Sequence, residues 1–164
     1  MAKQKEEKTN VMRVLEQKGV AYTPHTYPTD GSIDGASVAA YLGQDPEHVF
    51  KTLVARGASG GYYVFDIPVE DTLDLKKAAK AVGEKSIEMI PVKELTPLTG
   101  YVRGGCSPLG MKKRLRTVLD SSARAQAAIV VSAGKIGYQV ELSPQDLAGL
   151  AEADFAPVTR DAAL

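Results

Sequence analysis

A glycine-rich segment near the middle of the chain carries the residue types best suited to form a site. It reads Gly-Gly-Cys-Ser-Pro-Leu-Gly over 104–110. Its glycines and proline allow several backbone N–H groups to converge on one point, an arrangement that binds anions or a carbonyl oxygen that gains negative charge. The same residue types also form ordinary structural turns, so the segment alone leaves both interpretations open.

Cys106, within this segment, is the only cysteine in the chain of 164 residues. Basic neighbours could lower its pKa and make it a nucleophile. Such a cysteine normally needs a histidine base. His25 and His48 are both distant from it in the sequence, and only the fold can decide whether either comes near, so we favour a structural cysteine. Two histidines and one cysteine are also too scattered for a metal site, and no zinc-ligand pair, phosphate-binding loop or nucleophile elbow occurs.

Lys51 is a charged residue inside the apolar run 49–54. By strand alternation it shares a face with Val49 and Leu53. Its ammonium group must therefore reach solvent, pair with an acid or point into a cavity that receives a ligand. The pattern suits an edge-strand lysine and a functional lysine equally well.

Positive charge is concentrated in one segment, although the whole chain has 20 basic and 20 acidic residues and no net charge. The zero balance argues against a protein that binds nucleic acid by charge alone. The basic residues between 103 and 124 face a single acid, Asp120, and they are Arg103, Lys112, Lys113, Arg114, Arg116 and Arg124. This segment suits a phosphate-bearing ligand, and the alternative is a solvated surface.

Helices and strands that could position these residues alternate irregularly along the chain. Cap residues and apolar spacing predict helices at 10–18, 34–42, from 45, at 75–82, 92–95, after 121 and at 144–150. Alternation and turn residues predict strands at 21–27, 49–56, 62–68, 85–90, 115–119, 128–132, 138–142 and 155–158. The second and third strands form a hairpin around 57–61 in the middle of the sheet. This order is not a regular βαβ repeat, so we expect an α+β fold on a mixed, barrel-like sheet.

Length and composition predict one soluble domain. Hydrophobic residues make up 44% and charged residues 24%, as in ordinary globular proteins. A single cysteine forms no internal disulfide, no apolar run approaches the ~20 residues of a membrane span, and the polar start lacks the apolar stretch of a signal peptide. We expect a cytoplasmic protein with a polar tail at 1–8 and one domain at 9–160.

Four segments in this order closely resemble the YbaK/EbsC family, and they lie at 22–27, 49–53, 73–78 and, most specifically, 100–113. The resemblance extends from about Asn10 to Val158. The family comprises freestanding relatives of the editing domain inserted in bacterial prolyl-tRNA synthetase, and its members deacylate Cys-tRNA(Pro). The resemblance implies a mixed, mostly antiparallel, barrel-like sheet flanked by helices.

The resemblance also implies roles for particular residues. Lys51 matches the essential lysine of the family, which is implied to orient the terminal adenosine phosphate or the aminoacyl ester, and Tyr27 matches a pocket tyrosine. The loop implied to hold the aminoacyl group through its backbone contains Gly104, Gly105, Ser107 and Pro108, with Cys106 at a position that tolerates aliphatic residues. A second loop bordering the pocket contains Ser132, Gly134 and Lys135. One departure is Gln139, which stands where well-known members carry an acid.

The chemistry implied by the resemblance needs no nucleophile, cofactor or metal from the protein. The thiol of the substrate cysteine attacks its own ester and forms a cyclic thiolactone, while the protein positions the groups and stabilises the oxyanion. The predicted substrate is Cys-tRNA(Pro), with Cys-tRNA(Cys) as a further candidate. The expected tRNA contacts are Arg103, Lys112, Lys113, Arg114 and Arg116. Zero net charge predicts weak tRNA affinity and help from prolyl-tRNA synthetase. The alternatives are hydrolysis of another species, such as Ala-tRNA(Pro), and a non-catalytic module that binds tRNA or a synthetase.

Overall fold

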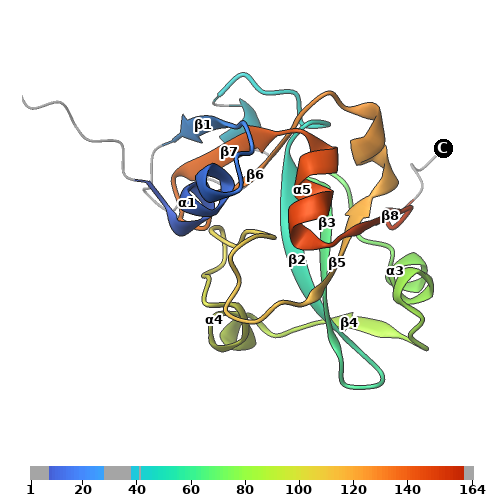
Figure 1. Ribbon diagram of the computed structural model, residues 1–164. Coiled ribbons are helices and arrows are strands. Elements are labelled where there is room, and N and C mark those ends of the chain that lie inside the picture. Colours follow the sequence, from blue (N-terminus) through green and yellow to red (C-terminus); the bar gives the residue numbers. More distant parts are fainter. Residues whose placement is uncertain (1–7, 28–37, 41, 161–164) are drawn as a thin grey trace, which may run out of the picture.

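Two β-sheets with helices packed around them make up the part of the chain that the structure, a computed structural model, describes: residues 8–27, 38–40 and 42–160 (Figure 1). The smaller sheet has the strand order β1-β7-β6 and the larger sheet has the order β4-β2-β3-β5-β8. An isolated parallel bridge between Val49 and Val130, with the Val130 N–H donating to the His48 carbonyl at 2.8 Å, links the start of β2 to β6.

The larger sheet is built on the predicted hairpin. β2 (Phe50–Gly57) and β3 (Tyr62–Pro68) pair antiparallel, with Arg56 opposite Tyr62, and the pair lies inside the sheet as expected. β4 (Ile87–Met89) adds to the outer edge of β2. On the other side, β5 (Arg116–Asp120) pairs parallel with β3, and β8 (Asp154–Ala156) pairs parallel with β5.

The smaller sheet carries the strands that border the second predicted loop. β7 (Tyr138–Leu142) is its central strand, between β1 (Thr23–Thr26) and β6 (Ile129–Ser132), and both pairs are antiparallel. Pro24 lies in β1, an edge strand, where its missing N–H is best tolerated. The sequence-based prediction of an edge strand here is confirmed.

The helices begin and end close to the predicted cap residues. Thr9 caps α1 (Asn10–Gln17) by accepting the Met12 N–H, and Asp74 caps α3 (Leu75–Val82), which ends at Gly83 in the left-handed conformation. The remaining helical segments are α4 (Val92–Thr99), the 3-10 turn η1 (Ser121–Ala125) and α5 (Pro144–Ala151). None of the helices in the described ranges is long and apolar enough to span a bilayer.

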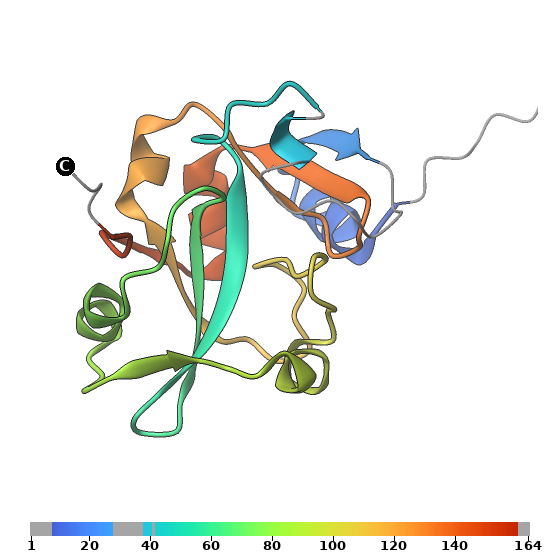
Figure 2. The same cartoon turned by 180° about the vertical axis from the view of Figure 1, so that it is seen from behind.

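Two apolar cores lie on opposite faces of the larger sheet. α1, α5 and the smaller sheet pack with Phe50 and Leu119 on one face, and α3 packs with Phe65 and Ile67 on the other. Figure 1 shows α5 in front of the larger sheet, and Figure 2, from behind, shows β2 in front of α5. Because alternate residues of β3 face opposite sides, Phe65 and Ile67 enter one core while their neighbour Asp66 faces the other.

Several sequence-based expectations need correction. The α+β class is confirmed, but the described residues form two sheets and no closed barrel, so the barrel-like sheet is not confirmed. The helix predicted from Asp45 is wrong: residues 46–48 form a turn, because Val49 already joins the sheet by accepting the Val69 N–H at 2.8 Å. The predicted turn at 28–31 and most of the helix at 34–42 lie outside the described residues.

Two other helices differ from their predicted form. α4 continues past residue 95 to Thr99 although Pro97 lies inside it, and it ends at Gly100 in the left-handed conformation. η1 is a 3-10 turn that is capped by Asp120 and not by the serines that follow it. The carboxylate of Asp120 accepts from both the N–H and the hydroxyl of Ser122, which gives a stronger cap than a serine hydroxyl alone.

Candidate functional site

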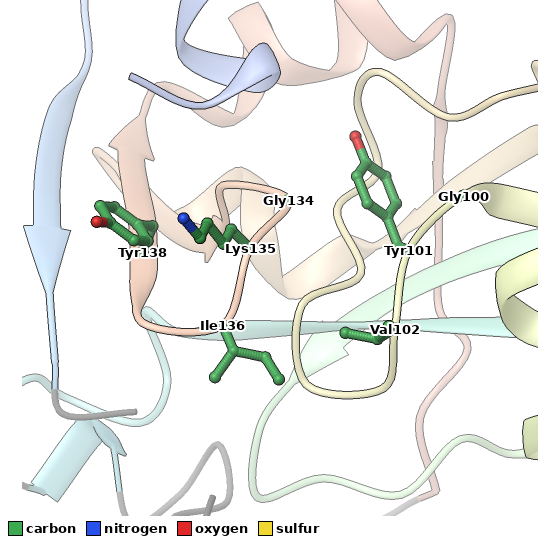
Figure 3. A pocket seen from close by; sticks show the side chains of 7 residues that line it. All are labelled: Gly100, Tyr101, Val102, Gly134, Lys135, Ile136 and Tyr138. Carbon is green, nitrogen blue, oxygen red and sulfur yellow. The ribbon is translucent and has the colours of Figure 1, made fainter. Parts of the chain in front are cut away.

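Two loops from different parts of the chain approach each other closely in space (Figure 3). One follows α4 and contains the glycine-rich segment, and the other joins β6 to β7. A Cβ on Gly105 would lie 3.0 Å from the backbone nitrogen of Ile136, and a Cβ on Gly134 would lie 2.9 Å from Tyr101 Cε1. Glycine at these two positions is therefore what allows the loops to touch.

An open hollow of about 460 Å³ lies between these loops. Its walls are formed by Gly100, Tyr101, Val102, Gly134, Lys135, Ile136 and Tyr138 (Figure 3). The hollow combines apolar surface with an aromatic ring and a cation, and loop backbones surround it. Such a lining suits a ligand that carries both a flat ring and negative charge.

Tyr101 holds the first loop in shape. Its hydroxyl donates to the Leu109 carbonyl at 2.5 Å, and its N–H donates to Thr99 Oγ1 at 3.0 Å. Burial raises the pKa of Tyr101 to about 12, so the phenol stays protonated and keeps its role as donor at neutral pH. Tyr101 was not a predicted site residue, although it lies within the segment 100–113 that carried the family resemblance.

The second loop is a tight turn with Lys135 at its tip. The Ser132 hydroxyl accepts the Gly134 N–H at 3.1 Å, and Lys135 Nζ lies 5.3 Å from the centre of the Tyr138 ring. Tyr27 joins the same region, because its N–H donates to the Gly137 carbonyl at 3.0 Å. The fold thus brings together Tyr27, Ser132, Gly134 and Lys135, which the sequence had assigned to one pocket.

The interior of the glycine-rich loop is buried. Gly104 is exposed, whereas the segment from Gly105 to Leu109 is buried, and the Ser107 hydroxyl accepts the Leu109 N–H at 3.3 Å. Burial, with a smaller contribution from the charge of Asp66, raises the pKa of the Cys106 thiol to about 12. A thiol with this pKa holds almost no thiolate at neutral pH, which supports a structural role for Cys106.

Lys51 lies elsewhere on the larger sheet. It is the second residue of β2, opposite Ile67, and it is half-buried. Burial lowers the pKa of its ammonium group, and the nearby charge of Asp71 acts in the other direction. Lys51 does not line the hollow between the two loops. The contact between Lys51 and the substrate therefore stays a prediction from the sequence.

The predicted tRNA-binding residues divide into two groups. Arg114 pairs with Glu152 at 2.7 Å, and Arg116 lies 3.6 Å from Asp154 and also donates to the last carbonyls of α3. Lys112 donates to the Pro97 carbonyl at 3.4 Å. Arg103 and Lys113 are exposed. Acids distant in sequence therefore offset part of the local positive charge.

Gln139, the residue that departs from the family pattern, is buried and has a hydrogen-bond partner distant in the sequence. Its Oε1 accepts from Gln44 Nε2 at 3.0 Å. On β7 it is in register with His25 and Ser132. The amide thus holds the segment before β2 against the smaller sheet.

Comparison with known proteins identifies the family. The sequence profile of one family, the aminoacyl-tRNA editing domain, matches residues 33–150 of this chain. This chain belongs to that family. The editing domain is also 46% identical to EbsC of Enterococcus faecalis, whose name assigns it as a Cys-tRNA(Pro)/Cys-tRNA(Cys) deacylase, over 161 residues that cover 97% of this chain and 98% of EbsC. The resemblance expected from the sequence is confirmed.

The chain is also similar to part of a proline–tRNA ligase and to solved structures. It is 28% identical to the proline–tRNA ligase of Pelobacter propionicus over 100 residues, which are 61% of this chain and 17% of the ligase. A crystal structure assigned as a trans-editing enzyme for prolyl tRNA synthetase superposes with a TM-score of 0.79 at 25% identity and covers 92% and 95% of the two chains. The hypothetical protein APE2540, with a TM-score of 0.82 at 24% identity and 92% and 99% coverage, shares the fold.

The contact between the loops predicts that Gly134→Ala costs more stability than its matched control, Gly60→Ala. Both glycines have positive φ, 90° and 92°, but only Gly134 would bring its Cβ against Tyr101, whereas nothing lies within 4 Å of a Cβ at Gly60. We expect a loss of about 1–2 kcal/mol for Gly60→Ala from the backbone conformation alone and at least about 1 kcal/mol more for Gly134→Ala. Urea unfolding of both variants measures this, and equal losses would contradict the contact.

Proposed function

We propose that this editing domain, over residues 9–160, deacylates Cys-tRNA(Pro) and Cys-tRNA(Cys). The observation that carries the proposal is the 46% identity with EbsC over nearly the whole of both chains. The hollow between the two loops, with a ring and a cation at its edge, supports it, because a tRNA acceptor end presents bases, phosphates and an ester to its enzyme. Similarity to part of a proline–tRNA ligase supports prolyl-tRNA synthetase as a partner.

The proposed reaction uses the substrate as its own nucleophile. The sulfur of the cysteinyl group bonds to its ester carbonyl carbon, the bond from that carbon to the ribose oxygen breaks, and the thiol proton ends on the ribose hydroxyl. The products are a cyclic thiolactone and free tRNA. The high pKa of Cys106 supports this route, because the loop then offers no thiolate of its own.

The protein contributes position and electrostatic stabilisation in this proposal. Gly104 presents its backbone N–H group to the developing oxyanion, and Lys51 binds the terminal phosphate or the ester. Gly105 contributes to catalysis by shaping the turn, with its N–H donating to the Val102 carbonyl at 2.9 Å. The aminoacyl end is held by Tyr27, Cys106, Ser107, Pro108, Ser132, Gly134 and Lys135. The close approach of Gly105 to Ile136 and of Tyr27 to Gly137 supports a single binding region formed by both loops.

Deacylation of Cys-tRNA(Pro) and Ser-tRNA(Pro), measured side by side, tests the route. The two substrates differ only in sulfur against oxygen, and the serine hydroxyl is a far weaker nucleophile near neutral pH. We expect cleavage of the cysteinyl ester at least a hundredfold faster. Similar rates for both esters would mean that water or an enzyme group attacks, as in the hydrolytic editing of a species such as Ala-tRNA(Pro). Binding without cleavage of either would indicate a non-catalytic module.

Lys51→Ala tests the proposed role of this lysine. Removing a group that stabilises transition-state charge typically lowers kcat about 10²–10³-fold, and we expect a loss of this size for cysteinyl-tRNA. Lys85→Ala, at an exposed position on the way into β4, is the matched control and should retain full activity. Single-turnover rates measure both variants. Undiminished turnover by Lys51→Ala would remove the residue from the site.

The exposed cations Arg103 and Lys113 are the predicted residues best placed to bind tRNA phosphates, because Arg114 and Arg116 already have acidic partners. Replacing both with Ala should weaken tRNA binding and flatten the slope of log K against log salt by about one per lost phosphate contact. The matched control replaces Lys76 and Lys80, exposed on α3, and should leave the slope unchanged. Filter binding between 50 and 200 mM salt gives both slopes. Equal slopes for the two double variants would mean that Arg103 and Lys113 are solvated surface residues that do not contact phosphates.

A further inference from the structure

Asp66 is a fully buried carboxyl group with an incomplete set of partners. It lies in β3 with 0% exposure. Thr52 Oγ1 donates to its Oδ1 at 2.6 Å, while Oδ2 has no hydrogen-bond partner among the described residues. Burying an unpaired carboxylate is costly, so burial raises the pKa of Asp66 to about 7, and the Thr52 hydrogen bond acts in the opposite direction.

This carboxyl group lies beneath the glycine-rich loop. In the register of β2 and β3, Thr52 is opposite Asp66 and Val54 is opposite Val64, so all four face the same side of the sheet. On that side, Cys106 packs in one cluster with Val54 and Val64. The Cys106 thiol is close enough to Asp66 for the carboxylate charge to raise its pKa.

The groups around Asp66 leave its charge without compensation. β2 presents the neutral Thr52, β5 presents Leu119 in register, and the loop presents the Cys106 thiol. Tyr101 is the next titratable group, beyond Cys106, and it stays protonated at neutral pH. No charged side chain in the described ranges contributes to the pKa of Asp66. When the Asp66 carboxyl ionises, water must therefore reach it to solvate the charge. The element that would have to move to let water in is the glycine-rich loop.

We propose that Asp66 is a positioning residue that holds the segment 104–110 closed over the sheet when its carboxyl is protonated and releases it when the carboxyl ionises. The neutral acid carries no charge that the buried contact with the loop must accommodate, whereas the carboxylate repels the electron-rich thiol sulfur and draws in solvent. Since the closed state binds a proton that the open state loses, closure is favoured at low pH and weakens as pH rises through 7. Its effect on deacylation rests on the proposed function, but the loop movement itself does not.

Cys106 provides a direct probe of the loop, because it is the only cysteine in the chain and is 7% exposed. The labelling rate by a disulfide reagent such as DTNB reports opening. We expect the ratio of the wild-type rate to the Asp66→Asn rate to rise at least fivefold between pH 6 and pH 8.5, because Asn keeps the shape and cannot ionise. Asp120→Asn, at another buried carboxyl whose oxygens accept from Ser122 and Val158, is the matched control with a flat ratio.

Thr52→Val provides a second, independent test. It removes the hydrogen bond that lowers the pKa of Asp66, so the labelling transition should move to higher pH. Simple loosening of the core would speed labelling at every pH without moving the transition. A pH-independent ratio for Asp66→Asn, or an unshifted transition in Thr52→Val if Asp66→Asn does not fold, would overturn the proposal.

The pH profile of single-turnover deacylation links the loop to catalysis. We expect the wild-type kcat, divided by that of Asp66→Asn, to fall at least threefold between pH 6 and pH 8.5. A flat ratio beside a clear labelling transition would overturn the positioning role in catalysis. Absence of any deacylation, with the labelling transition intact, would instead count against the proposed function and leave the loop movement standing.

Discussion

The close contact between two loop backbones is the constraint on which the rest of the site depends. Gly105 meets the backbone of Ile136, and Gly134 meets the ring of Tyr101, so the loops can touch only where no Cβ intervenes. One loop leads into β5 of the larger sheet, and the other joins β6 to β7 of the smaller sheet. The hollow between them therefore requires both sheets to be correctly placed. The parallel bridge from Val49 to Val130 and the shared core around Phe50 provide that placement. The stability of the fold and the shape of the site are therefore coupled.

The polar groups beneath the site hold the loop in shape, and none of those described below is ionised to act as a nucleophile. Tyr101 is held protonated and bonded to the Leu109 carbonyl, and the Cys106 thiol is held protonated by burial. These groups shape the buried interior of the loop, and residues 100–102 of the same loop line the hollow. Such an architecture suits a reaction in which the substrate carries its own reactive group and the protein contributes geometry. Asp66 is the exception within this support, since its charge is not compensated by a partner.

Local signals predicted most of the elements. Thr9, Asp74 and Ser143 cap the helices expected of them, and the glycines at 57–61 turn the expected hairpin. The failures have long-range causes. Residues 45–47 carry a strong helix-start signal. No helix forms, because the Val49 carbonyl accepts the Val69 N–H and so joins the sheet. Of the residues that line the hollow, the sequence had singled out Gly134 and Lys135. It had not singled out Tyr101, Ile136 and Tyr138, because their place in the lining depends on the opposite loop.

The sequence by itself determined the class of fold, the positions of the loops and, through the segment 100–113, the family. Caps, alternation and turn residues act over a few neighbours, so their consequences are visible in the chain. Only the tertiary structure decided which basic residues find acidic partners, that Lys51 lies apart from the hollow, and that Asp66 is buried beneath the loop. These outcomes depend on groups far apart in the chain, and burial changes the cost of a charge only once the fold has removed it from water.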